Sequence, residues 1–151
     1  MGGSAYRWGS LAAFGLLSAL PQFVSATEPC KLLTVQEIGH ALGGSVSPPT
    51  PLGANGCLWK GSPGSLTLVL RSEATWARLT APGPGVVKTN LSGLGEAASI
   101  SHMEQATEKN LQTLSVKQGA NVIVLTIIGI NDTERQRSAE ESLARLALPR
   151  L

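Results

Sequence analysis

Aromatic side chains are scarce in this chain beyond its first 26 residues. Four of its six aromatic residues lie within that N-terminal stretch, so Trp59 and Trp76 are the only ones that follow. Stacking platforms for bases or sugars are therefore few. The 12 basic and 10 acidic residues nearly balance and form no basic block, which makes nucleic acid a poor candidate partner.

Catalytic signatures are missing as well. The sequence has no Gly-x-Ser-x-Gly turn, no phosphate-binding Gly-Lys-Ser/Thr loop and no His-Glu-x-x-His motif. With only two histidines, His40 and His102, a nucleophile and its base are hard to assemble. We therefore predict no catalytic residues and no cofactor, and keep an enzyme of unrecognised type as an alternative.

Two short sequences carry potential metal ligands. Glu37-x-x-His40 places a carboxylate and an imidazole on one helical face, and His102-Met103-Glu104 is a second pair. Each pair is only half of a site, and nothing in the sequence brings the two together. We interpret Glu37 as a helix cap and His40 as an exposed residue near a helix end, and predict no metal site.

The first 26 residues have the pattern of a signal peptide. Arg7 supplies a positive start, residues 11–20 are apolar, Pro21 interrupts them, and small residues precede a cleavage point after Ala26. The apolar stretch is too short for a typical transmembrane helix, which disfavours the alternative of a retained anchor. A lipid anchor requires a cysteine directly after the cleavage point, and this sequence has none there. We expect a periplasmic or secreted protein of residues 27–151 without a stable membrane span.

Cys30 and Cys57 are the only cysteines, and an oxidising destination favours a disulfide between them. The bridge would close a loop of roughly 28 residues, for which chain entropy gives about 3.5 kcal/mol. The alternative, a reactive or metal-binding thiol pair, lacks the close spacing of a Cys-x-x-Cys motif.

The organising element of the predicted fold is a hairpin. Residues 111–118 alternate between apolar and polar side chains, Gly119 allows a tight turn, and residues 122–130 are almost continuously apolar. A β-branched run of this length is typical of a core strand. We expect both faces of that second strand to be covered.

The remaining elements complete a single α+β domain. A capping box of Thr34 and Glu37 starts a helix that ends at Gly43-Gly44. Residues 56–60 and 65–71 form a second predicted hairpin, residues 96–102 a short strand, and the proline-rich residues 45–56 a loop. Ser72 caps a short helix that contains Trp76. We predict a roughly five-stranded, largely antiparallel sheet packed by about three helices.

Asn131 or Asp132 caps the last predicted helix. The pattern assigns its side chains to two faces. The inward set is Ala139, Leu143, Leu146 and Ala147, and the outward set is Glu134, Arg135, Glu140 and Arg145.

A family resemblance rests on three short motifs, Glu-Pro-Cys-Lys-Leu-Leu-Thr at 28–34, Cys-Leu-Trp at 57–59 and Gly-Leu-Gly-Glu-Ala-Ala at 93–98. The pattern resembles that of actinobacterial exported lipoprotein domains to which no reaction is assigned. The resemblance covers most of residues 27–151 and implies a PsbP-like α+β sheet with its two cysteines bridged. This chain departs from the family by lacking the lipid-anchor cysteine.

Trp59, Trp76 and Arg71 are the candidate ligand-binding residues, two for apolar contact and one for an anionic group. The competing interpretation is that both tryptophans pack in the core. We predict an exported, non-catalytic binding or interaction module of the cell envelope, with an envelope protein or a small molecule as its partner. A pocket for a small apolar or amphipathic ligand would show a cavity between sheet and helices, and a protein adaptor would show an exposed patch or a free sheet edge.

Overall fold

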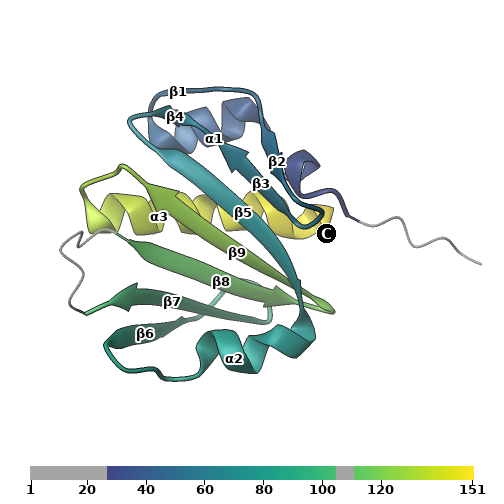
Figure 1. The fold of residues 1–151 in the computed structure, drawn as a ribbon, viewed down its shortest axis with the longest axis vertical. Helices are drawn as coiled ribbons and strands as arrows, with labels where there is room; N and C mark the ends of the chain where they lie inside the picture. Colours follow the sequence, from purple (N-terminus) through teal and green to yellow (C-terminus); the bar gives the residue numbers. More distant parts are fainter. Residues whose placement is uncertain (1–26, 105–110) are drawn as a thin grey trace, which may run out of the picture.

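The structure, a computed structural model that describes residues 27–104 and 111–151, is built on an antiparallel sheet (Figure 1). Within these ranges the sheet has seven strands in the spatial order β2-β3-β5-β9-β8-β7-β6. The strands are β2 (Thr50–Leu52), β3 (Gly56–Trp59), β5 (Ser65–Ser72), β6 (Val86–Leu91), β7 (Ala97–Met103), β8 (Gln112–Gln118) and β9 (Asn121–Ile128). A ribbon pairs β1 (Ser45–Val46) with β4 (Gly61–Ser62). The predicted signal peptide, residues 1–26, lies outside the described residues.

The predicted central hairpin is confirmed. β8 and β9 pair in register from Gln118↔Asn121 to Thr113↔Thr126, and Gly119 adopts the positive φ of 57° that the tight turn requires. β9 also pairs along its whole length with β5, so that Leu125 lies between Leu68 and Leu114. The apolar run therefore occupies the middle position of the sheet.

The sheet has seven strands where we predicted five. Of the two missed strands, β2 has three residues with Pro51 at its centre, and β6 is an edge strand without a fully buried residue. Each strand pairs on one side only, β2 with β3 and β6 with β7. Edge strands need no continuous apolar pattern, and an edge is where a proline is tolerated. The predicted loop over residues 45–56 thus contains two short strands, β1 and β2.

Three α-helices occur in the described part of the chain: α1 (Val35–Leu42), α2 (Trp76–Thr80) and α3 (Thr133–Ala147). The α1 capping box is confirmed, because the Glu37 amide donates to Thr34 Oγ1 and the Thr34 amide donates to Glu37 Oε2. Asp132 caps α3 by accepting from the Arg135 amide at 3.0 Å. α3 lies across the sheet face that points away from the viewer in Figure 1, whereas α2 lies beside β6. Short 3-10 turns cover Pro29–Lys31, Glu73–Thr75 and Leu148–Arg150.

The core lies between the sheet and the helices α1 and α3. Leu68, Leu125 and Leu114, which are lateral neighbours on three strands, are fully buried together with Ile38 of α1 and Leu143 of α3. The predicted single α+β domain with about three helices therefore holds.

The buried stripe of α3 differs from the predicted one at two positions. Leu146 is 38% exposed rather than buried, and Glu140 is fully buried rather than exposed. The buried face consists of Gln136, Ala139, Glu140, Leu143, Ala144 and Ala147. This face includes two polar residues because the end of β9 offers unpaired backbone groups for them to bind, as described below.

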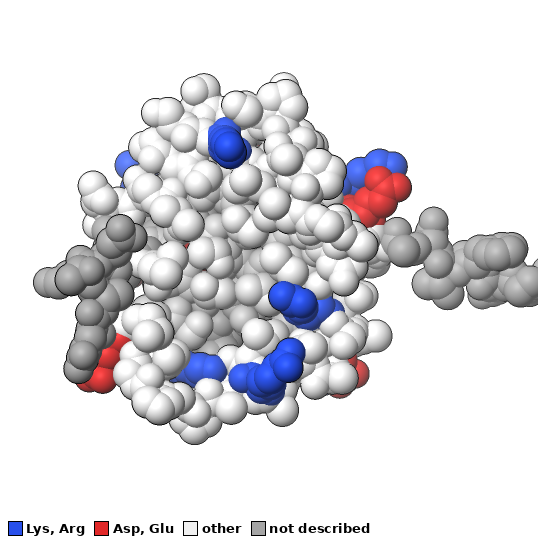
Figure 2. Space-filling model, in the orientation of Figure 1, with Lys and Arg blue, Asp and Glu red and all other residues white. Residues whose placement is uncertain are grey.

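The prediction that both faces of the core strand are covered holds only in part. Ile123, Leu125 and Ile127 are fully buried on the helix side. On the other face Val122 is also fully buried, but Val124 and Thr126 are only half-buried and Ile128 is 50% exposed. This open face carries threonine hydroxyls, which water can solvate. Thr126 Oγ1 lies 3.1 Å from Thr113 Oγ1 on the next strand. In Figure 2, which shows this side of the molecule, charged side chains lie around an uncharged middle.

The predicted disulfide is present. Cys30 and Cys57 are bonded, with their Cα atoms 5.2 Å apart. The bond attaches the first turn of the described chain to β3, and Cys57 is fully buried in the core. No free cysteine occurs among residues 27–104 and 111–151.

Candidate functional site

The two tryptophans predicted as ligand contacts have different environments. Trp59 is fully buried and lies on the core face of β3, opposite Leu66 of β5. Its indole Nε1 has no hydrogen-bond partner in the structure. Trp59 is therefore a core side chain to which a ligand has no access in this conformation.

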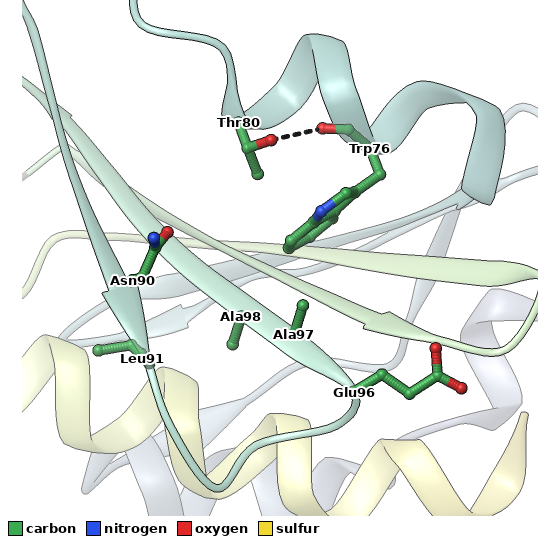
Figure 3. A pocket seen from close by; sticks show the side chains of 7 residues that line it. All are labelled: Trp76, Thr80, Asn90, Leu91, Glu96, Ala97 and Ala98. Carbon is green, nitrogen blue, oxygen red and sulfur yellow. Dashed lines mark hydrogen bonds between the residues drawn. The ribbon is translucent and has the colours of Figure 1, made fainter.

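Trp76, by contrast, is only half-buried and borders a hollow of about 440 Å³. The hollow is lined by Trp76 and Thr80 of α2, Asn90 and Leu91 of β6, and Glu96, Ala97 and Ala98 at the start of β7. Figure 3 shows the indole ring pointing from α2 toward β7, the Asn90 amide pointing into the space from β6, and the Ala97 side chain pointing toward the indole. The side chains of Leu91 and Ala98 point away from the hollow, toward the core. This volume lies within the roughly 300–1,000 Å³ typical of small-molecule sites.

Hydrogen bonds fix α2 over the sheet although the helix spans only Trp76–Thr80. Lys88 Nζ of β6 donates to the Leu79 carbonyl, whereas the bond from Thr80 Oγ1 to the Trp76 carbonyl, at 2.9 Å, lies within the helix itself (Figure 3). At the other end, Glu73 pairs with Lys117 of β8 at 2.5 Å. Contacts to two different strands thus hold Trp76 in place.

The floor of the hollow depends on Gly95. This residue has a φ of 59°, and a Cβ atom added to it would lie 2.6 Å from the Lys117 carbonyl oxygen and 2.7 Å from Val116. Only glycine allows the loop before β7 to approach β8 so closely. Of the residues that follow, Ala97 points toward the hollow, and its short side chain leaves the space under the indole unfilled.

The inner surface of the hollow carries little charge. Glu96 lines it, but Figure 3 shows its carboxylate pointing away from Trp76. Glu96 Oε1 instead accepts from the Gly119 amide at 3.0 Å, and Oε2 lies 3.9 Å from Lys117 Nζ. The polar group that faces the space is the Asn90 amide, whereas the Thr80 hydroxyl points toward the Trp76 carbonyl, to which it donates.

Arg71, the third predicted contact, lies in a different place. It is on the open face of β5 and lines a smaller hollow of about 270 Å³ with Thr27, Asn55, Ser72 and Asn121 among its neighbours. Its side chain makes no ion pair or hydrogen bond within the described residues. The structure therefore joins none of Trp59, Trp76 and Arg71 into one site.

Glu37 serves the fold rather than a metal. Besides capping α1, its carboxylate receives two hydrogen bonds from Arg150, Nη2 to Oε1 at 2.6 Å and Nη1 to Oε2 at 2.9 Å. These bonds lower the pKa of Glu37 to about 2. Within residues 27–104 and 111–151, no cluster of three or more His, Cys, Asp or Glu side chains suits a metal ion.

A buried polar pair on α3 was missed by sequence reasoning. Glu140 Oε1 accepts from the Ile127 amide at 3.2 Å, and Gln136 Nε2 donates to the Ile127 carbonyl at 2.8 Å. The pairing of β8 with β9 ends at Thr113↔Thr126, one residue short of Ile127. The helix side chains thus bind the backbone groups of β9 beyond the end of the β8 ladder. Burial raises the pKa of Glu140 to about 8.

Sequence reasoning selected Trp76 but not the residues that surround it. Asn90 and Thr80 carry no signal of their own, because their role depends on α2 lying beside β6. The alanines at 97 and 98 occur in one of the motifs behind the family resemblance, but that motif says nothing of a space above them. Only the pairing of β6 with β7 brings these residues together.

No protein-family model, curated protein or solved structure significantly matches this chain. Among the described residues, the structure has no helix that is both long and apolar enough to span a membrane.

Proposed function

We propose that the chain is an exported, non-catalytic binding module of the cell envelope that holds a small amphipathic molecule in the hollow beside Trp76. The observation that carries this proposal is the half-buried indole over unfilled space. An indole that served only packing would be expected to meet close-packed neighbours, as Trp59 does in the core. At Trp76 the facing residues are small, and a volume of about 440 Å³ is left open.

The lining favours an amphipathic ligand over a purely apolar one. The indole and the Ala97 side chain offer apolar contact, whereas the Asn90 amide offers hydrogen bonds. An entirely apolar molecule would cover the Asn90 amide without giving it a partner, which costs free energy. A ligand with both kinds of surface satisfies both halves of the hollow.

The same lining supports a non-catalytic role. Glu96 is the one ionisable residue among the described residues that line the hollow, and its carboxylate points away from the space and accepts from the Gly119 amide, so no base faces a bound ligand there. Glu140, a carboxyl with a raised pKa, is fully buried between α3 and β9 and does not line the hollow.

Export belongs to the proposal and is supported by the Cys30–Cys57 bond. Disulfides persist in oxidising compartments such as the periplasm and the extracellular medium. Mass spectrometry of the protein from its own cells gives the decisive test, since the expected N-terminus is Thr27. A leader that remained attached would contradict this part of the proposal.

The hollow itself is tested by fluorescence in a Trp8→Phe chain, where Trp59 and Trp76 are the only tryptophans. The probe is N-phenyl-1-naphthylamine, an uncharged aromatic amine whose emission rises on leaving water. We expect saturable binding that Trp76→Ala abolishes and that Arg71→Ala, in the second hollow, leaves unchanged. Binding that is indifferent to Trp76→Ala would contradict the assignment of this hollow as the site.

A further inference from the structure

We infer that the ligand of the Trp76 hollow is a neutral saccharide, bound through one sugar ring that lies against the indole. The inference rests on the proposed function and names its ligand class. It combines three features of the hollow: a flat aromatic face, uncharged hydrogen-bonding groups opposite that face, and a floor without bulk.

The first feature is the indole face. Aromatic rings carry negative charge density on their faces, and the C–H groups on one side of a pyranose ring form a flat, slightly positive surface of matching size. Trp76 is half-buried, so one part of its indole packs on the protein while another part borders the hollow. A sugar ring with its C–H face toward the indole replaces the water on that part.

The second feature is the chemistry opposite the indole. The Asn90 amide has both a donor and an acceptor group, and the Thr80 oxygen, whose proton is engaged with the Trp76 carbonyl, can still accept. Sugar hydroxyls also donate and accept, so each can pair with an amide or a hydroxyl in either sense. Figure 3 shows the Asn90 amide directed into the space between β6 and Trp76.

The third feature is the absence of an available charge in the lining. The Glu96 carboxylate is bound to the Gly119 amide and points away from the hollow, and Lys88 Nζ is bound to the Leu79 carbonyl. A charged ligand would therefore lose its hydration without gaining a charged partner. A neutral polyhydroxy molecule does not incur this cost.

The floor sets the size of the bound group. The short side chain of Ala97 lies beneath the hollow, whose volume is about 440 Å³. The site is open to solvent along the edge strand β6, so a neighbouring sugar unit of a longer chain can extend outward from the bound ring. We therefore expect disaccharides to bind at least as well as the corresponding single sugars.

The test is displacement of the uncharged probe N-phenyl-1-naphthylamine by a panel of neutral disaccharides built from glucose, galactose, mannose or N-acetylglucosamine. At least one should displace the probe at concentrations up to about 10 mM, above the millimolar end of the affinity scale. Raising the salt concentration should leave the affinity within about twofold, because no ion pair forms. Direct binding by calorimetry gives the same answer if the probe itself does not bind.

Variants separate the sugar site from a general effect on folding. Trp76→Ala and Asn90→Ala should each weaken saccharide binding about tenfold or more, which corresponds to about 1.4 kcal/mol. The matched control is Thr89→Ala, an exposed neighbour on β6 whose side chain points to the other face of the sheet. Circular dichroism confirms that each variant is folded. In ligand-observed saturation-transfer NMR, protons on one face of the sugar ring should receive most of the magnetisation.

The outcomes distinguish the two claims. If the probe binds in a Trp76-dependent manner and no saccharide displaces it or binds directly, the hollow is a ligand site and the saccharide class is wrong. If neither the probe nor any saccharide shows Trp76-dependent binding, both the saccharide class and the proposed function are wrong. Strong weakening of saccharide binding by salt would overturn the neutral character of the ligand.

Discussion

Replacing Glu140 with glutamine should remove a pH dependence that is built into the core. The carboxyl is fully buried, and its pKa is raised from its ordinary value of 4.5 to about 8. Desolvation is the main cause, and the hydrogen bonds from Gln136 and the Ile127 amide oppose the rise. Between pH 4.5 and about 8 the folded protein therefore holds a proton that the unfolded chain has lost.

The sign of the effect follows from proton linkage. Stability falls with rising pH wherever the folded state binds more protons than the unfolded state. The loss begins near the unfolded pKa of 4.5 and levels off above the folded pKa of about 8. At about 1.36 kcal/mol per pKa unit, the loss of unfolding free energy across this pH range is at most roughly 5 kcal/mol. Relaxation of the protein and entry of water around the carboxyl will reduce this loss.

Glutamine is a close replacement because it keeps the acceptor that the Ile127 amide needs at 3.2 Å. It places an uncharged amide group where Glu140 Oε2 has no partner. Glu140→Gln should therefore be more stable than the parent at pH 9 and similar to it at pH 5. Glu134→Gln, an exposed position on the same helix, is the matched control.

Urea denaturation at pH 5, 7 and 9 measures this difference directly, with the unfolding free energy extrapolated to water for each protein. The parent and Glu134→Gln should lose stability between pH 5 and pH 9, and Glu140→Gln should lose markedly less. Parallel pH profiles for the parent and Glu140→Gln would show that the carboxyl is not held neutral in the folded protein, and the burial argument would then be wrong.

Three further outcomes follow from the fold. Leu125→Ala should destabilise the protein by about 2–5 kcal/mol in urea denaturation, because Leu125 is fully buried, while Thr126→Ala on the half-buried open face should cost much less; similar losses for both would remove β9 from the core. Arg150→Ala should raise the pKa of Glu37 from about 2 toward 4.5. The stability that ionised Glu37 gives the parent, which is lost as the pH falls from 4.5 to 2, should therefore be largely absent from the variant. An unchanged dependence of stability on pH in this acid range would mean that the pair is not formed. The native protein should resist thiol alkylation until it is reduced, and reduction should cost about 3.5 kcal/mol; rapid labelling of the native protein would contradict the Cys30–Cys57 bond.

The sequence revealed those elements whose apolar pattern is complete within the element itself. The run at residues 122–130 identified the central strand, and the capping box identified the start of α1. β2 and β6 were not predicted, because each is an edge strand that is stabilised by a neighbour on one side only. An edge strand with Pro51 or Lys88 at its middle has no local pattern that distinguishes it from a loop.

The same reasoning explains what was missed at the functional sites. Helical periodicity assigned Glu140 to solvent, because a pattern within one helix cannot show that Ile127, which pairs with β5, has no partner on the β8 side. Trp76 was selected for its size, but its surroundings come from residues 14 to 22 positions further along the chain. A hollow that forms between elements this far apart needs the topology before it can be recognised.

The pairing of β5 with β9 has a consequence for how local stability is distributed. These strands are neighbours in the sheet, yet α2, β6, β7 and β8 all come between them in the chain. The hollow is formed by this intervening part of the chain. Two of the elements that line it, α2 and β6, contain no fully buried residue. Such elements open at a lower free energy than the core, so their amide hydrogens should exchange well before those of β9. A ligand that joins α2 to β6 would then act by ordering the edge of the domain, and its binding would be visible as slowed exchange there while the central strands remain unchanged.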